Sequence, residues 1–191
     1  MRTIGICIPT YNRYQQTIDC FAQVLHDERV DSVTITDDAS TDDSYEKLLE
    51  YFKDESKVRI IRNEKNLDCY ANKHEAVKYS NSEFVGVWDS DNVFDKSYLN
   101  TLFNLPEWDK HTLYQPEFSR PYFDFRQWSG LTIIKENVAQ YTTTHLMTAL
   151  NAFNLFINRE EYLKVWDGSV DPITSDSIYF NYCWLCAGNK V

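Results

Sequence analysis

Residues Phe84 to Asn92 read FVGVWDSDN, an apolar run that passes directly into acidic and amide side chains. The part from Phe84 to Trp88 has the length and the composition of a buried strand. Ligands of open α/β sheets bind beyond the carboxyl ends of the strands. The two acids of the triplet Asp89-Ser90-Asp91 therefore stand where a binding site is expected.

Carboxylates two positions apart, such as Asp89 and Asp91, can both approach one cation from an extended or turning backbone. Their oxygens suit Mg²⁺ or Mn²⁺. Such an ion bridges the phosphates of a nucleotide diphosphate and neutralises the charge that develops on them. An Asp-x-Asp tripeptide is also common in solvated loops and helix caps, but its place behind so apolar a strand favours the metal interpretation.

The first half of the chain repeats this order of strand, polar turn and helix. Strands are expected at Ile4 to Ile8, Val33 to Thr36, Val58 to Ile61 and Phe84 to Trp88. Amphipathic helices are expected at about Tyr14 to His26, after the capping cluster Ser40 to Asp43, and at about Tyr70 to Ser80. This alternation predicts βαβ units and an α/β fold with a mainly parallel sheet flanked by helices.

The second half is less regular. Prolines and aromatic residues crowd the stretch from Leu105 to Arg126, which predicts an irregular packed segment. Further on, a strand is expected at Asn154 to Ile157 and helices at Arg159 to Val165 and Ser175 to Ala187. The 191 residues suffice for one domain with a sizeable core. Because another strand is expected to begin near Val191, we expect the natural protein to continue.

The chain is acidic, with 29 Asp and Glu against 19 Lys and Arg and a net charge of −10. This charge repels phosphate backbones, so nucleic acid is not expected as a partner. No apolar run approaches the roughly 20 residues of a membrane span, and no secretion signal precedes the first strand. We therefore expect a cytoplasmic protein that reaches a membrane only peripherally, through its acceptor or partner proteins. An anionic ligand would need local help from a metal ion, helix N-termini or a few cations.

The five cysteines are odd in number and are expected to be reduced, buried thiols. Cys183 and Cys186 have the spacing of a zinc or redox pair. Neither a second pair of ligands nor the strand-to-helix context of a redox motif accompanies them, so two core thiols are the favoured interpretation.

Polar clusters follow three of the expected strands, at Pro9 to Arg13, Asp37 to Ser40 and Asp89 to Asn92. If the strands are neighbours, the clusters meet in one crevice. Asp38 is then placed to accept hydrogen bonds from a base or a ribose, although acids and hydroxyls here also cap the next helix, as Thr41 or Asp42 can.

Three further side chains near these strand ends each have two interpretations. Tyr11 packs over a planar base or only fills a groove. Arg13 and Lys73 either pair with phosphate or are cations that face solvent. The phosphate interpretation would make them part of the nucleotide site.

Together these stretches, IPTYNR at 8–13, DDASTD at 37–42 and DSDN at 89–92, resemble the family 2 glycosyltransferases of the GT-A fold. The resemblance is close over Ile4 to Leu102 and looser over Asn154 to Gly188. It implies inverting transfer of a sugar from a nucleoside diphosphate sugar, commonly a uridine one, with Mn²⁺ or Mg²⁺ as cofactor. The expected acceptor is a hydroxyl of a glycan or polysaccharide, whether lipid-linked or not. Within one GT-A domain spanning residues 1–191, residues 1–104 would bind the nucleotide sugar and residues 105–191 would face the acceptor.

The resemblance also implies roles for single residues at the strand ends. It places three of them in the nucleoside pocket: Pro9, Tyr11 and Asp38. Ser90 matches a ribose-facing position, Asp91 the principal metal ligand and Asp89 a weaker one.

In this family a late helix supplies the general base, as Glu-Asp followed by an aromatic residue four positions on. Ser175-Asp176 with Phe180 matches this place. An aspartate that faces the acceptor hydroxyl can take its proton as the oxygen attacks the sugar. The alternative is that Asp176 only interacts with the dipole of its helix.

The sequence departs from the family pattern at three places. Asp68 replaces a glycine, Lys73-His74 stand where Arg-Asn is usual, and Ser175 replaces the first acid of the late pair. The expected continuation of the chain could hold a further metal ligand, which keeps open a module that binds a nucleotide sugar without efficient turnover. A nucleotidyltransferase is disfavoured, because Pro9 to Asn12 is not the glycine-rich first loop that such enzymes need.

Overall fold

The computed structural model describes residues 2–119, 123–141, 150, 154–169 and 176–191. The strands are β1 (Ile4–Thr10), β2 (Val30–Asp37), β3 (Val58–Arg62), β4 (Phe84–Val87), β5 (Phe118–Ser119), β6 (Phe123–Asp124) and β7 (Leu155–Asn158). The α-helices are α1 (Tyr14–Phe21), α2 (Ser44–Tyr51), α3 (Asp68–Tyr79), α4 (Lys96–Asn104), α6 (Arg159–Val165) and α7 (Asp176–Cys186). Two short 3-10 helices are η1 (Arg126–Trp128) and η2 (Val138–Tyr141).

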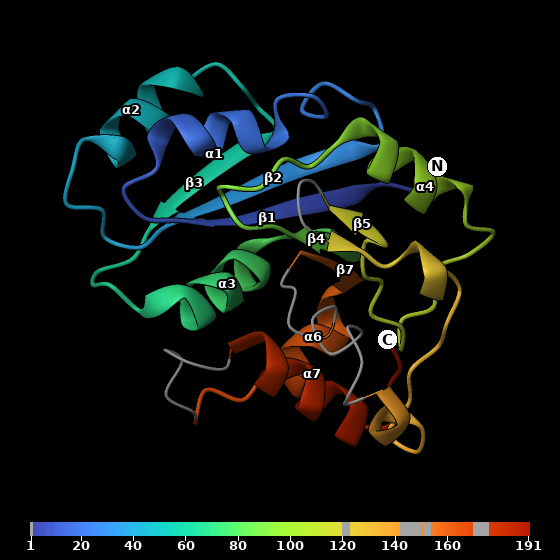
Figure 1. Cartoon of the computed structure of the whole chain (residues 1–191). Helices are drawn as coiled ribbons and strands as arrows, with labels where there is room; N and C mark the ends of the chain where they lie inside the picture. Colours follow the sequence, from blue (N-terminus) through green and yellow to red (C-terminus); the bar gives the residue numbers. More distant parts are fainter. Residues whose placement is uncertain (1, 120–122, 142–149, 151–153, 170–175) are drawn as a thin grey trace.

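A five-stranded sheet in the order β3-β2-β1-β4-β7 forms the centre of the molecule (Figure 1). β1 pairs in parallel with β2 and with β4, and β2 pairs in parallel with β3. β7 runs antiparallel to β4. The predicted α/β fold with a mainly parallel sheet is thus confirmed, and the second half of the chain adds a strand to the sheet that the first half builds.

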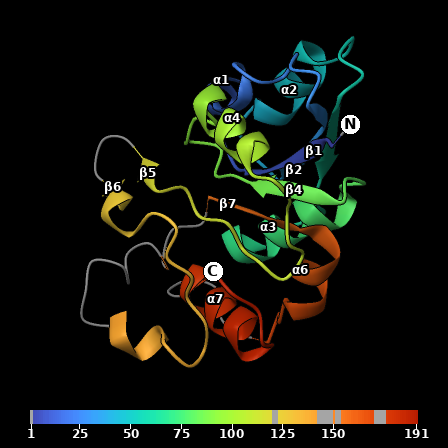
Figure 2. The same ribbon diagram turned by 90° about the vertical axis from the view of Figure 1, so that its right-hand side faces the viewer.

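Helices cover both faces of this sheet. α1, α2 and α4 lie on one face, and α3, α6 and α7 lie on the other (Figures 1 and 2). Side chains along β1 point alternately to the two faces of the sheet. Ile6 and Ile8 pack in the core on the side of α1, whereas Cys7 packs in the core on the side of α3. A strand that is buried on both faces needs apolar residues at every position, which explains its continuous apolar sequence.

The helix after β1 is shorter than the sequence predicts. α1 ends at Phe21, and the chain continues to His26 in turns, so the predicted helical end was wrong. The backbone N–H of Phe94 donates to the Cys20 carbonyl at 2.6 Å, where a helix would place the N–H of Val24. The Val24 N–H donates to the Phe21 carbonyl instead, at 3.0 Å. A contact with a distant segment therefore ends the helix early.

α4 has no counterpart among the helices expected from the sequence. Asp95 caps α4 by accepting a hydrogen bond from the Ser97 N–H at 2.5 Å. Leu99 and Leu102 are the buried residues of this helix. An aspartate before apolar residues at helical spacing is a usual start signal, so this helix was predictable from local sequence.

The cysteines differ in exposure. Cys7 and Cys20 are buried, and burial raises the pKa of the Cys7 thiol to about 12, which makes it unreactive. Cys183 is partly exposed, and Cys69 and Cys186 are exposed. The expectation of buried thiols was therefore wrong for Cys69 and Cys186.

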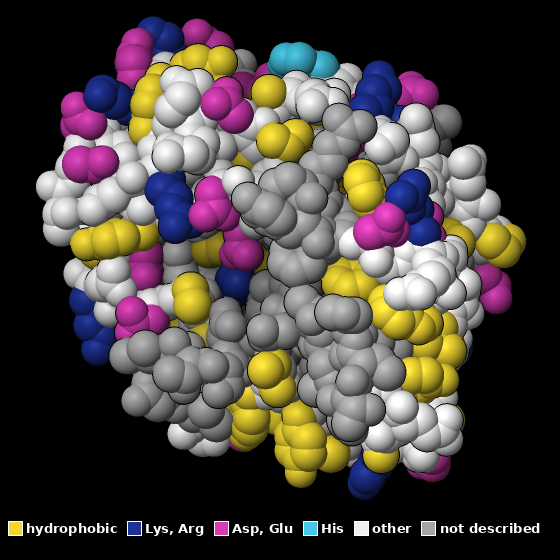
Figure 3. All heavy atoms as spheres, viewed as in Figure 1, with side chains coloured by type: hydrophobic (Ala, Val, Ile, Leu, Met, Phe, Trp, Pro, Cys, Tyr) yellow, Lys and Arg dark blue, Asp and Glu magenta, His cyan; other side chains and the backbone are white. Residues whose placement is uncertain are grey.

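The surface mixes charges of both signs. Figure 3 shows acidic side chains interspersed with Lys and Arg over the part of this face that carries α1 and α2. Among the helices that the structure describes, none is both long and apolar enough to cross a bilayer.

Candidate active site

Three polar clusters meet at the carboxyl ends of β2, β1 and β4, which are neighbours in the sheet. The backbone N–H of Asn12, after β1, donates to Oγ of Ser40, after β2, at 2.9 Å. In the same loop, Nη1 of Arg13 lies 2.9 Å from Oδ2 of Asp91, after β4. These contacts join all three clusters into one site, as expected for neighbouring parallel strands.

Asp38, which directly follows β2, is buried, with only 2% of its surface exposed. Its Oδ1 accepts hydrogen bonds from Nδ2 of Asn63 at 2.8 Å and from the backbone N–H of Leu67 at 2.9 Å. Burial raises the pKa of the Asp38 carboxyl, although these hydrogen bonds act in the opposite direction. A buried and oriented acceptor suits recognition of an N–H donor.

Two asparagines outside the predicted site support Asp38. Nδ2 of Asn63 also donates to Oδ1 of Asn72 at 3.0 Å, and Nδ2 of Asn72 donates to the Thr36 carbonyl at 3.1 Å. Asn72 thereby fastens α3 to β2. Asn63 directly follows β3, so the rule that sites lie at strand ends could have found it, whereas Asn72 lies inside a helix and carries no such signal.

The other acids after β2 have structural roles. Asp37 is buried and accepts hydrogen bonds from the N–H of Ser40, at 3.0 Å, and from the Ser40 hydroxyl. Asp42 accepts a hydrogen bond from the Ser44 N–H at 2.9 Å, at the start of α2. Asp37 thus holds the turn, and Asp42 holds the start of α2.

The triplet after β4 carries its two acids in different environments. Oδ1 of Asp89 lies 2.9 Å from Nζ of Lys73, whose side chain is only 4% exposed. The Arg13 and Asp91 side chains, in contrast, are 46% and 47% exposed. Ser90 between the acids is buried. Because Lys73 is a buried cation beside the triplet, the interpretation of Lys73 as a solvent-facing charge was wrong.

Distant segments set the position of this triplet. The backbone N–H of Asp89 donates to Oδ1 of Asn154, just before β7, at 3.0 Å. The Trp88 ring packs on Phe94 with 4.7 Å between centroids. A Cβ on Gly86 would lie 2.8 Å from the Phe94 ring, so glycine in β4 allows that ring to approach the strand.

The corner before α3 keeps a backbone conformation that glycine favours. Asp68 has a φ of 66°, in the left-handed region that aspartate tolerates better than most residues. Its N–H donates to Oδ1 of Asn66 at 2.9 Å. Replacing a glycine by Asp68 therefore preserves this backbone conformation, and the difference is an added, exposed carboxylate.

Pro9 and Tyr11 differ in what they can offer a ligand. Pro9 is buried within β1, opposite Thr36, and shapes the strand end. Tyr11 in the following loop is 40% exposed, so its ring is accessible to a planar ligand.

Asp176 is the first residue of α7, on the face of the sheet that α3 also covers. Its side chain lies outside the described residues, as does Ser175. Its predicted role as a base remains a prediction.

The residues of the triplet fit a divalent cation. Mg²⁺ in proteins is commonly held by one or two carboxylates together with substrate phosphates and water. Asp89 and Asp91 provide such carboxylates, both of them partly exposed. Within the described part of the chain, no group of three or more His, Cys, Asp or Glu side chains could hold a metal.

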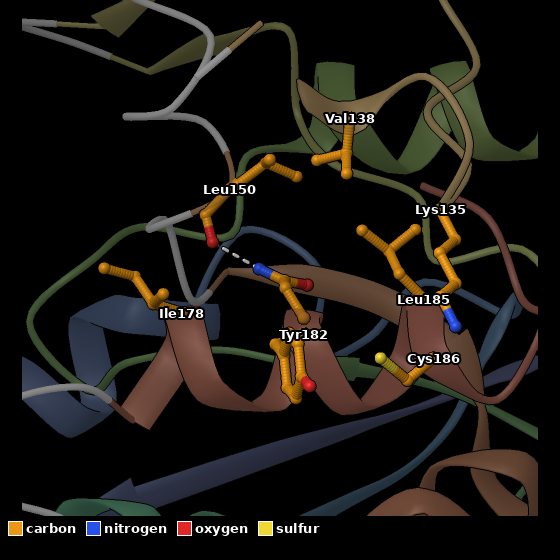
Figure 4. Close-up of a pocket in the computed structure, with 8 residues that line it drawn as sticks. Lys135, Val138, Leu150, Ile178, Tyr182, Leu185 and Cys186 are labelled. Atoms are coloured by element: carbon orange, nitrogen blue, oxygen red, sulfur yellow. Dashed lines mark hydrogen bonds between the residues drawn. The ribbon is translucent and has the colours of Figure 1, made fainter. Parts of the chain in front are cut away.

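A separate hollow of about 300 Å³ lies along α7 (Figure 4). Of the eight described residues that line it, only Lys135 is charged. Ile178, Tyr182 and Leu185 line it from α7. Because these residues include no acid, the hollow does not suit a diphosphate with its metal.

The sequence model of the family described as Glycosyl transferase family 2 matches residues 5–169. Glycosyltransferase GlyG of Streptococcus pneumoniae is 23% identical over 101 residues, 52% of this chain and 34% of GlyG. Chondroitin synthase of Escherichia coli is 31% identical over 93 residues, 48% of this chain and 13% of that protein. Succinoglycan biosynthesis protein ExoU of Rhizobium meliloti is 28% identical over 106 residues, 56% of this chain and 31% of ExoU. The chain thus spans about a third or less of the length of these relatives.

Solved structures show the same fold. S. aureus TarS matches with a TM-score of 0.71 at 14% identity, over 96% of this chain and 33% of that chain. TarS 1–349 in complex with UDP-GlcNAc also matches with a TM-score of 0.71 at 14% identity, over 96% of this chain and 53% of that chain. Together with this GT-A fold, the family match over most of the chain shows that the protein belongs to glycosyl transferase family 2.

Proposed function

We propose that this domain is an inverting glycosyltransferase that moves a sugar from a uridine diphosphate sugar to a hydroxyl of a glycan or polysaccharide acceptor. The observation that carries the proposal is the clustering at three adjacent strand ends of buried Asp38 after β2, Arg13 after β1, and the ion-paired acids Asp89 and Asp91 after β4. The names of chondroitin synthase and of the succinoglycan protein ExoU support a polysaccharide acceptor. The TarS complexes with UDP and UDP-GlcNAc support a uridine donor.

In this proposal the nucleoside is bound by groups that are in place before it arrives. The base packs on Tyr11, and Asp38 accepts a hydrogen bond from a base N–H. Asn63 holds the Asp38 carboxylate at 2.8 Å, so little side-chain freedom is lost on binding. Pro9 shapes the pocket, and buried Ser90 faces the ribose.

Mn²⁺ or Mg²⁺, when bound, neutralises the charge on the leaving diphosphate. Asp91 is its proposed principal ligand, because its pair with Arg13 is half exposed and such pairs contribute less than about 1 kcal/mol. Asp89 is the weaker ligand, since its partner Lys73 is buried and costly to leave without a counter-charge. Arg13, once released from Asp91, and Lys73 are then placed to pair with phosphate oxygens.

Asp176 is the proposed general base. It takes the proton of the acceptor hydroxyl as the oxygen attacks the anomeric carbon, and the diphosphate leaves from the opposite face of the sugar. Asp176→Asn keeps the size of the side chain but removes the proton acceptor. We expect this variant to bind UDP like the wild type and to lose transfer. Equal transfer rates in the two proteins would reject the role.

Thermal unfolding with nucleotides and Mn²⁺ tests the donor site. A ligand that binds only the folded state raises the Tm by mass action. UDP with Mn²⁺ should raise the Tm more than ADP, CDP or GDP with the same metal. A rise with another nucleotide and none with UDP would contradict the uridine donor.

The second candidate function is a module that binds a nucleotide sugar without efficient turnover. Ser175 favours this module, because it stands where the family usually has the glutamate of the Glu-Asp pair at the start of the late helix. A screen of nucleotide sugars separates the two functions. Release of UDP from any donor supports the transferase, whereas UDP binding without release from any donor supports the module.

A further inference from the structure

The carboxylate of Asp167, just after α6, bonds to the first turn of α7. Its Oδ2 accepts a hydrogen bond from the Tyr179 hydroxyl at 2.8 Å, and its Oδ1 accepts one from the backbone N–H of Ser169 at 2.9 Å. Tyr179 lies in the first turn of α7, which begins at Asp176. Asp167 therefore joins the end of α6 to the start of the helix that carries the proposed base.

Both partners of this bond have the protonation state that it needs. Hydrogen bonds from Ser169 and Tyr179 lower the pKa of the Asp167 carboxyl. The bond to Asp167 raises the pKa of the Tyr179 hydroxyl to about 12. At neutral pH a carboxylate thus accepts from a protonated hydroxyl, and such charge-assisted bonds are stronger than neutral ones.

The preceding residue, Trp166, packs against α3. The Trp166 ring stacks on His74 with 3.9 Å between centroids and on Tyr70 with 5.5 Å. A Cβ on Gly168 would lie 2.5 Å from the Trp166 ring, so only glycine permits this close approach. α3 also carries Lys73, the cation beside the acidic triplet. Trp166, next to Asp167, is therefore held against the helix that carries Lys73.

Apolar packing of α7 does not by itself set the position of its first turn. Phe180 of α7 stacks on Tyr162 of α6 with 4.7 Å between centroids. Apolar contacts of this kind are non-directional and tolerate small shifts along or about the helix axis. A hydrogen bond requires a defined distance and angle, so the Tyr179 bond restricts these shifts.

We infer that Asp167 and Tyr179 are positioning residues for the general base at Asp176, an inference that rests on the proposed function. A general base must lie within hydrogen-bonding reach of the hydroxyl whose proton it takes. A misplacement of about 1 Å can slow an enzyme by about a hundred-fold. The bond between Asp167 and Tyr179 keeps the first turn of α7 at the place where the base can work.

Tyr179→Phe tests the inference, because it removes only the hydroxyl. We expect kcat for transfer to fall by about ten-fold or more, with the donor KM and the UDP-dependent rise in Tm as in the wild type. Tyr182→Phe is the matched control, since Tyr182 lies on the same helix with its side chain exposed. The control should keep the wild-type kcat.

Variants of Asp167 complete the test. Asp167→Ala should lower kcat at least as much as Tyr179→Phe does, because it removes the Tyr179 bond and also the bond from the Ser169 N–H. The double variant should be no slower than Asp167→Ala, because that single change already removes the Tyr179 bond. Asp167→Asn retains an oxygen that can accept from Tyr179 and should keep more activity than Asp167→Ala. This rescue is not expected if Asp167 matters only for its charge.

The results separate this inference from the proposed function. A wild type that neither transfers nor hydrolyses any donor contradicts the proposed function itself. An active wild type whose Tyr179→Phe variant keeps full kcat overturns the positioning role. Additive losses in the double variant, or a raised donor KM with an unchanged kcat, also overturn it.

Discussion

At the scale of single residues, neighbouring acids in the site differ in their roles because they have different partners. Asp37 holds the turn after β2, whereas Asp38 next to it is oriented by Asn63 and is the acceptor that we propose for the base. Asp91 pairs with a half-exposed arginine. Three aspartates with similar local sequences are therefore not interchangeable.

Asp38→Ala should weaken UDP binding by about ten-fold or more, because it removes a buried charged acceptor. It also leaves the Asn63 amide and the Leu67 N–H without this partner. Isothermal titration measures the change. Asp42→Ala is the control, since it removes a carboxylate that caps α2 and should leave UDP affinity near that of the wild type. Equal losses in both variants would contradict the role of Asp38.

Lys73→Met should lower the free energy of unfolding by about 1–3 kcal/mol, because it leaves partly buried Asp89 without its counter-charge. Arg13→Gln should lower it by less than about 1 kcal/mol, since that pair is half exposed. Urea unfolding of both variants gives the comparison. A larger loss for Arg13→Gln would show that burial does not distinguish the two pairs.

Removal of divalent metal should weaken UDP binding in the wild type. Asp91→Asn should abolish the difference in UDP affinity between Mn²⁺ and EDTA, and Asp89→Asn should reduce it less, because Lys73 already neutralises Asp89. Titration of each variant in both buffers measures these differences. An Asp91→Asn variant that keeps the full metal effect would exclude Asp91 as the principal ligand.

At the scale of elements, α3 connects separate parts of the site through consecutive residues. Asn72 bonds to the end of β2, Lys73 pairs with the triplet after β4, and His74 stacks on Trp166. Successive residues of a helix point in directions about 100° apart, so three neighbours in sequence reach three different parts of the fold. We expect changes in α3 to affect donor binding and the acceptor side together.

The stack of His74 on Trp166 should make stability depend on pH. Burial lowers the pKa of His74 below its ordinary value of 6.5. The unfolded chain then binds this proton more readily than the folded one. The contribution of His74 to the free energy of unfolding is therefore fully present above about pH 6.5, and it is lost as the pH falls toward the lowered pKa. His74→Phe keeps a ring at this place but does not titrate.

Urea unfolding at about pH 7.5 and about pH 5 measures this effect. The wild type should lose more stability between these values than His74→Phe. Equal losses in the two proteins would show that His74 does not contribute to the pH dependence.

At the scale of the whole molecule, the charge of −10 opposes the approach of an anionic nucleotide. Lys73 and Arg13 beside the site are paired with acids, so they do not create an uncompensated positive field there. In the absence of metal, the association rate of UDP should therefore rise as salt screens the repulsion. Stopped-flow mixing at low and at physiological ionic strength tests this. A rate that falls with salt would indicate local attraction that outweighs the net charge.

Much of the fold was predictable because it follows from local patterns. β1 and β4 are apolar runs because both faces of the sheet are covered, and the capping role of Asp42 is a local interaction. The early end of α1 was not predictable, since the Cys20 carbonyl bonds to a residue far along the chain. α4 carried a local signal in Asp95 and was nevertheless absent from the prediction.

By itself, the sequence determined the alternation of strands and helices, the polar clusters at the strand ends and the resemblance to a family. Only the tertiary structure decided the partners: Lys73 with Asp89, Arg13 with Asp91, and Asn63 with Asp38. These pairs join segments that are far apart in the chain. The order of residues records distance along the backbone, whereas charge pairing and hydrogen bonding depend on distance across the folded sheet.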